Sequence, residues 1–201
     1  MLKIHHLGPT RGLRIVWQCE EMGLPYEIEK ASFPTSAAYR SLNPNGSLPF
    51  LEDEGGVAIN ESVAIMLYLA TKYGPTPLLP GKDDPCLATA MQFTVFGEGT
   101  LGAFGNVILG ARFFAPEADK KNWSVLRAAE RLQTALDFVA DKLGGGPFLA
   151  GERFTLADIS VGYAVGFARG ALGEFVSLPA SLNTYHDRLT ARPAYQRAVA
   201  K

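Results

Sequence analysis

Three short segments in the first third of the chain place polar groups where a small charged molecule could be held. The first is Gly8-Pro9-Thr10-Arg11, between a strand predicted over 2–7 and a helix predicted over 11–22. Free amides and the partial positive charge at a helix N-terminus attract anions, and the Thr10 hydroxyl could hydrogen-bond such an anion. The alternative is that Thr10 only caps the helix, and this segment by itself favours that alternative.

The second segment is Asn43-Pro-Asn-Gly-Ser-Leu48-Pro49-Phe-Leu51, where a proline opens a predicted strand. Proline at this place suits an edge strand or a cis peptide. A cis bond would turn the N–H and C=O of Leu48 away from the sheet, where they could pair with an extended peptide. An ordinary trans proline that starts the strand is the alternative.

The third segment is Asn60-Glu61-Ser62, just before a predicted helix. Ser62 together with the first helix amides forms an anion site, and Glu61 can accept from an ammonium group. The pair therefore suits the zwitterionic end of an amino acid. Here too the alternative is a cap, with Asn60 or Ser62 satisfying the helix end.

The amino-acid composition limits the kinds of partner that we expect the protein to bind. The 201 residues include 19 basic and 20 acidic side chains, a net charge of −1, so no overall field draws the protein to nucleic acid or an anionic membrane. Cys19 and Cys86 are far apart and histidines number only three, which favours neither a disulfide framework nor a metal site. The longest uncharged stretches are too short for a membrane span, and the N-terminus lacks the apolar core of a signal peptide. We expect a soluble, cytoplasmic protein.

The elements that position the three segments follow from periodicity. Strands are predicted over 2–7, 26–30, 48–52 and 57–59, and helices over 11–22 and 62–73, which together indicate an α/β domain with a mixed four-stranded sheet. Gly74–Pro85, with four prolines and two glycines, is the best linker. The predicted ranges are 1–77 for the first domain, 78–85 for the linker and 86–201 for an all-helical domain.

The helical half contains one sharp local signal, Phe154-Thr155-Leu156-Ala157-Asp158-Ile159. Thr155 and Asp158 can exchange hydrogen bonds as a capping box, and Phe154 and Ile159 form the hydrophobic staple of a buried helix over 156–169. Further helices are predicted over 88–110, 120–143 and 181–192. A catalytic Asp158 is the competing interpretation, but the cap already explains the carboxylate.

Five runs carry a resemblance over essentially the whole chain: KIHHLGPTRGLRIVWQCEEMGLPYE, NPNGSLPFLED, INESVAIMLYLA, GPFLAGERFTLADI and YHDRLTARPAYQRA. The chain resembles the glutathione S-transferase family, in particular its bacterial members. The resemblance implies a thioredoxin-like first domain, an all-helical second domain, glutathione as co-substrate without a metal, and a cytoplasmic homodimer that acts in detoxification.

The resemblance also implies roles for individual residues. Leu48, before a cis Pro49, would pair its backbone with the cysteinyl part of glutathione, and Glu61 and Ser62 would hold the γ-glutamyl end. Ser47 stands where many relatives have lysine or glutamine near the glycyl carboxylate, which puts that contact in doubt.

Thr10 aligns with the serine or cysteine that many relatives direct at the glutathione sulfur. Relatives that use tyrosine place it near His5 and His6. A thiol with a pKa near 8.5 is mostly protonated at neutral pH, and the thiolate is the nucleophile. Thr10 would favour the thiolate as a hydrogen-bond donor, and threonine in place of cysteine argues against a mixed-disulfide mechanism.

A small hydrophobic electrophile would then be attacked by the sulfur. Its expected pocket is formed by apolar residues of both domains: Leu7, Gly12, Phe104, Ile108, Phe113 and Phe114. The alternative is that the aromatic cluster is helix core or dimer contact. Two other functions stay open at this point: a binding or interaction protein without turnover, and a glutathione-dependent isomerase, dehalogenase or peroxidase.

Overall fold

The computed structural model describes all 201 residues. Its sheet has the strand order β2-β1-β3-β4, with β1 and β2 parallel and the other neighbours antiparallel. The strands are β1 (Leu2–His6), β2 (Tyr26–Lys30), β3 (Phe50–Asp53) and β4 (Val57–Asn60). The predicted mixed four-stranded sheet is confirmed. Strand β3 begins at Phe50, two residues later than predicted, so Leu48 and Pro49 lie ahead of the strand.

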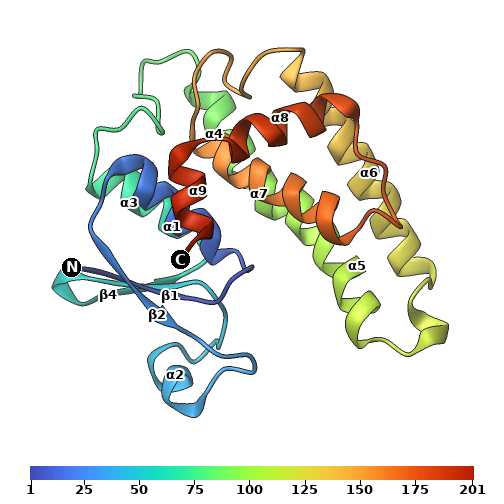
Figure 1. Cartoon of the computed structure of the whole chain (residues 1–201), viewed down its shortest axis with the longest axis horizontal. Helices are drawn as coiled ribbons and strands as arrows, with labels where there is room; N and C mark the ends of the chain where they lie inside the picture. The colour runs from blue at the N-terminus through green and yellow to red at the C-terminus, as the bar shows by residue number, and fades with distance from the viewer. The chain divides into compact units, whose positions relative to one another are not determined.

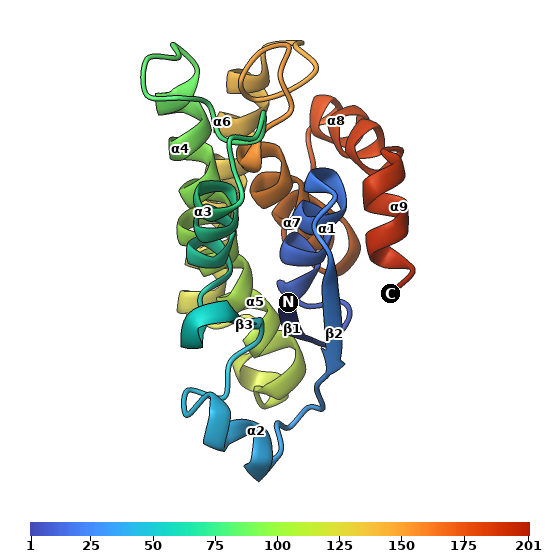
Figure 2. The ribbon, with the colours of Figure 1, turned by 90° about the vertical axis from the view of Figure 1, so that its left-hand side faces the viewer.

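Helices cover both faces of this sheet. Helices α1 (Gly12–Met22) and α3 (Ser62–Lys72) pack against each other on one face, and α2 (Ala37–Leu42) lies on the other side (Figures 1 and 2). Helix α1 ends as predicted at Gly23, whose φ of 65° is the left-handed conformation that glycine adopts without steric cost.

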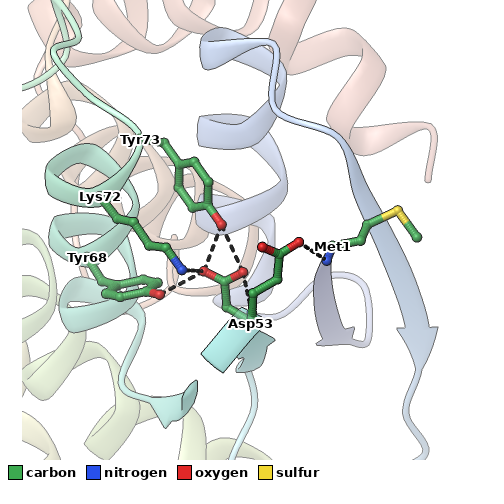
Figure 3. Close-up of polar contacts among 6 residues, drawn as sticks. Met1, Asp53, Tyr68, Lys72 and Tyr73 are labelled. Carbon is green, nitrogen blue, oxygen red and sulfur yellow. Dashed lines mark hydrogen bonds and ion pairs between the residues drawn. The ribbon is translucent and has the colours of Figure 1, made fainter. Parts of the chain in front are cut away.

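A buried carboxylate fastens α3 to the end of β3 (Figure 3). The Asp53 side chain has no exposed surface and accepts hydrogen bonds from Lys72 Nζ (2.7 Å), Tyr68 OH (2.7 Å) and Tyr73 OH (2.8 Å). It also accepts from the N–H of Glu54 at 2.7 Å. Because three of these donors come from α3 or the residue after it, Asp53 helps to fix where that helix lies on the sheet.

The chain from Pro80 to Thr190 forms a helical unit, in agreement with the predicted fold class. Its elements are α4 (Leu87–Phe96), η2 (Gly97–Gly102), α5 (Ala103–Phe114), η3 (Glu117–Asp119), α6 (Trp123–Leu143), α7 (Leu156–Ala171) and α8 (Ala180–Thr190). The stretch predicted as one helix over 88–110 is α4 and α5 joined through the π-helical η2. Helix α7 packs against α4, η2 and α8 and is the centre of this unit.

The capping box before α7 is present as predicted. Asp158 accepts from the N–H of Thr155 at 2.8 Å, from the N–H of Leu149 at 3.0 Å and from Tyr185 OH at 2.8 Å. These bonds account for the buried carboxylate as a structural group.

The chain divides into two compact units, Met1–Leu79 with Ala191–Lys201, and Pro80–Thr190. The last helix, α9 (Pro193–Val199), therefore belongs with the sheet, whereas the predicted ranges put it in the helical domain. Side chains explain this grouping: Arg192 pairs with Glu21 at 2.6 Å, and Tyr195 meets the Trp17 ring edge-on at 4.9 Å. None of the helices has the length and apolar character needed to cross a membrane.

Candidate functional site

The three segments lie at the same end of strands β1, β3 and β4. Register pairs His5 of β1 with Phe50 of β3, and Phe50 with Asn60 of β4, so these three residues form a row across the sheet. The loop that contains Thr10 follows β1, the Leu48–Pro49 pair precedes β3, and Glu61 and Ser62 follow β4. The sheet therefore gathers three segments that are far apart in the sequence.

Thr10 sits in a tight turn before α1. Its N–H donates to Leu7 O at 2.9 Å, and its hydroxyl oxygen accepts a long bond from the N–H of Gly12 at 3.4 Å. A contact of that length is weak, and the helix has no other side-chain cap. Because Thr10 Oγ1 acts as an acceptor in this bond, its own proton remains available to donate to a molecule at the turn.

His5 and His6 point to opposite faces of the sheet, as neighbours in a strand do. His5 packs between Tyr39 and Phe50, with ring centroids 5.5 Å and 5.4 Å away, and its Nε2 lies 2.6 Å from a Glu52 carboxylate oxygen. These contacts tie His5 to the face that carries α2.

His6 lies on the α1 side and is almost fully buried. Its Nδ1 has no hydrogen-bond partner, and burial lowers the pKa of the imidazole below its usual value. The ring lines a cavity of about 460 Å³ together with Leu7 and Leu13. Burial therefore favours the neutral form of the His6 imidazole, which lies beside the turn that contains Thr10.

Gly12 allows this packing, because a Cβ atom there would lie 2.2 Å from His6 Nδ1. We expect Gly12→Ala to lower the free energy of unfolding by about 1–3 kcal/mol through overpacking. Urea denaturation of Gly12→Ala, His6→Ala and the double variant measures the effect. The double variant should lose less stability than the sum of the single variants, and strict additivity would contradict the close contact.

The Leu48–Pro49 peptide is cis, as the family resemblance implies. The N–H and C=O of Leu48 make no hydrogen bond within the chain, since the sheet register starts at Phe50. The preceding loop is held from the other side, where the Ser47 carbonyl accepts from Tyr39 OH and Asn43 Nδ2. Leu48 thus presents an unpaired donor and acceptor on an anchored loop, while the Ser47 hydroxyl accepts from Asn45.

Glu61 has a strained backbone. Its φ of 68° and ψ of 106° make it the one non-glycine residue with positive φ in the chain, and such outliers cluster at functional sites. The Glu61 side chain is exposed, so its carboxylate is accessible.

The start of α3 at Ser62 has no side-chain cap, so the capping alternative for Asn60 or Ser62 is wrong. The first bond of the helix runs from the N–H of Ile65 to Glu61 O, which leaves the N–H groups of the first three helical residues unpaired. Ser62 itself is buried, and its hydroxyl accepts from Arg14 Nη1 at 3.0 Å. This helix end can hold an anion.

The residues predicted for an electrophile pocket belong to both units, so their assembly into one pocket stays a prediction. In the first unit, Leu7 borders the cavity described above and Gly12 is covered by His6. In the second unit, Phe104 is half-buried and Ile108 fully buried in α5, whereas Phe113 and Phe114 are 63% and 75% exposed.

Three supporting residues were not among the predicted site residues. Arg14 contacts the Ser62 hydroxyl, and Tyr39 and Asn43 hold the loop before Leu48. Arg14 could have been found, because it is a charged residue beside the apolar Val16 and Trp17 of the predicted helix and takes part in the R-x-x-W motif. No local pattern marks Tyr39.

Known proteins share both halves of this architecture. The family model for the glutathione S-transferase N-terminal domain matches residues 11–72, and the model for the C-terminal domain matches residues 121–198. The chain is 31% identical to glutathione S-transferase 3 of Schizosaccharomyces pombe, over 79% of this chain and 70% of that protein. It is 32% identical to glutathione S-transferase A of Pleuronectes platessa, over 79% of this chain and 71% of that protein. The chain belongs to the glutathione S-transferase family.

Solved structures agree. A glutathione transferase family member from Pseudomonas fluorescens, solved with two glutathione bound, superposes with a TM-score of 0.83 at 26% identity, over 98% of this chain and 92% of that one. A glutathione transferase from Burkholderia graminis, with two glutathione molecules bound per subunit, gives a TM-score of 0.84 at 25% identity, over 100% of this chain and 88% of that one.

Proposed function

We propose that this protein is a glutathione transferase that binds glutathione at this end of strands β1, β3 and β4 and activates its thiol for attack on a small hydrophobic electrophile. The observation that carries the proposal is the uncapped N-terminus of α3, with Ser62 at its first position just after β4, together with the unpaired peptide groups of Leu48 just before the neighbouring strand β3. The glutathione bound to two structural relatives supports the choice of ligand.

The chemistry of glutathione matches these groups one by one. The α-carboxylate of its γ-glutamyl end would take the Ser62 hydroxyl and the free amides of α3, and its ammonium would take the exposed Glu61 carboxylate. The cysteinyl peptide unit would pair with the N–H and C=O of Leu48, as in strand addition. Ser47 would lie toward the glycyl end.

Thr10 would then act on the sulfur. A hydroxyl that donates to the thiolate stabilises the anion relative to the thiol, and the partial positive charge at the start of α1 acts in the same direction. Lowering the thiol pKa by about two units requires about 2.7 kcal/mol of differential stabilisation. Thr10 needs no base for this role, because the proton leaves to solvent.

The electrophile, the assembly and the location belong to the same proposal. Exposed Phe113 and Phe114 could contact an aromatic electrophile. A homodimer would cover the apolar side chains that α4 and α5 expose, Met91, Val95 and Val107. We place the protein in the cytoplasm, where glutathione is kept reduced.

Calorimetric titration with glutathione, together with turnover of a chloro-dinitro aromatic electrophile, tests the proposal. Binding with turnover is the expected result. Binding without turnover on a panel of aryl halides, epoxides and hydroperoxides would favour a binding protein of this fold. If the protein catalyses only isomerisation, dehalogenation or peroxide reduction, the proposed glutathione site stands but conjugation is not its reaction. Failure to bind glutathione would overturn the proposed site.

A further inference from the structure

The cavity of about 460 Å³ that His6 lines is closed by three parts of the chain: the turn after β1, the end of β2 and helix α9. Helix α9 lies alongside α1 (Figure 2), where Arg197 pairs with Glu20 at 2.6 Å. The walls of the cavity are mostly apolar and include Leu7, Pro9, Leu13, Ile28, Ala198 and Val199. Its volume falls within the range of pockets that bind small molecules, so the cavity can take an apolar molecule.

His6 adds a buried polar group to these apolar walls. The residue is 7% exposed, and neither nitrogen of its ring has a hydrogen-bond partner within the chain. Gly12 packs against Nδ1, whereas Nε2 lies on the side of Gly8, which also borders the cavity. Buried N–H groups without an acceptor are rarer than buried acceptors without a donor, so the proton of the neutral ring belongs on Nε2. The cavity therefore contains a hydrogen-bond donor that lacks an acceptor.

A positive charge lies beside this donor. The register pairs His6 of β1 with Lys30 of the parallel strand β2, so both side chains leave the same face of the sheet. Lys30 borders the cavity, is exposed and forms no ion pair, and Lys201 borders the cavity as well. A carboxylate can accept from an imidazole N–H and from an ammonium group, and its charge is opposite to that of lysine. Two adjacent donors at one end of an apolar cavity thus fit a molecule with an apolar body and one carboxylate.

We propose that this cavity is a second binding site of the protein, for a small apolar monocarboxylate. The carboxylate would lie between His6 Nε2 and Lys30. The apolar body would contact Leu13, Ile28 and Val199. None of the groups assigned to glutathione borders this cavity, so the inference does not rest on the proposed function. Fatty acids and aromatic acids share the chemistry that the site requires.

Calorimetric titration with two pairs of probes tests the site. One pair is octanoate and octanol, and the other is naphthoate and naphthalenemethanol, so that each acid is compared with the alcohol of the same skeleton. At least one acid should bind, about threefold to tenfold more tightly than its alcohol. The acid that binds more tightly identifies the source as a fatty acid or an aromatic acid. Binding of neither acid, or equal binding of acid and alcohol, would overturn the inference.

Three variants locate the site. Lys30→Met should weaken binding of the acid about threefold to tenfold and leave binding of the alcohol unchanged. Val199→Glu, at a half-exposed position of the apolar wall, should weaken binding of both. The matched control is Lys3→Met, which removes an ammonium from the opposite face of β1 and should alter neither affinity. Equal effects of Lys30→Met and Lys3→Met would contradict the proposed site.

Nitrogen NMR of protein with labelled histidine measures the contact with His6 directly. The chain has three histidines, and the signals absent from His6→Gln identify those of His6. Saturation with the acid should shift the His6 signals more than those of His5 and His186. Unmoved His6 signals would overturn the contact. A protein that binds the acid but not glutathione would lose the proposed function and keep this second site.

Discussion

Replacing Thr10 with alanine is expected to reduce conjugation turnover at neutral pH by roughly 20-fold. The reason is the thiolate fraction: a thiol with a pKa near 6.5 is mostly ionised at pH 7, whereas one with the free value near 8.5 is only about 3% ionised. The Thr10 hydroxyl is half-buried and its single bond within the chain, from Gly12, uses the oxygen as acceptor. In the proposed complex, alanine removes the hydroxyl that donates to the sulfur from this turn.

Two measurements check this result. The pH dependence of turnover should shift toward higher pH in Thr10→Ala, so that the two enzymes converge above about pH 9. Ultraviolet titration of bound glutathione should show the same shift in thiol pKa. Thr10→Ser is the matched control, since it keeps the hydroxyl and should retain most of the activity. Unchanged turnover in Thr10→Ala would remove Thr10 from the mechanism and direct attention to His6.

Asp53→Asn is expected to lower the free energy of unfolding at pH 7 by about 2–4 kcal/mol, because a buried, charge-assisted network loses its acceptor charge. Burial by itself would raise the pKa of Asp53, but hydrogen bonds from Lys72, Tyr68 and Tyr73 outweigh it and hold the pKa well below its usual range. The folded protein therefore binds this proton less readily than the unfolded chain does.

The lowered pKa of Asp53 determines how the stability of the protein changes with pH. A carboxyl group whose folded pKa is lowered stabilises the protein above its unfolded pKa, near 3.9, and this contribution is lost as the pH falls below that value. The stability difference between the natural protein and Asp53→Asn should be constant from about pH 5 to pH 8 and shrink toward pH 2. Urea denaturation across this range measures it. Tyr73→Phe, which removes one donor only, should give a smaller difference, and a difference independent of pH would contradict the account.

Local chemistry made much of the fold predictable. Gly23 ends α1 and Thr155 starts α7 where expected. Both signals, a glycine that adopts the left-handed conformation and a capping box, depend on only a few adjacent residues. The positions of Leu48 and Ser62 beside element starts were likewise predictable. That Leu48 and Ser62 lie at the same end of the sheet follows from the pairing of β3 with β4. The sequence pattern of a single strand does not reveal that pairing.

The remaining features depend on contacts between distant residues. Periodicity places Arg14 on a helix but does not say that Ser62 lies opposite it. The same limit applies to α9, which groups with the sheet through distant contacts such as that of Tyr195 with Trp17. Gly12 was expected in a ligand pocket, yet the structure shows it pressed against His6, a contact fixed only when the turn folds.

In the proposed complex, the protein holds glutathione at one end of strands β1, β3 and β4, through Thr10, Leu48 and Ser62. A crystal structure of the protein with glutathione tests it most directly. The account predicts the sulfur within hydrogen-bond distance of Thr10 Oγ1, the cysteinyl peptide paired with Leu48, and the γ-glutamyl carboxylate at Ser62 and the start of α3. Glutathione bound elsewhere, or with its sulfur at His6 and away from Thr10, would contradict it.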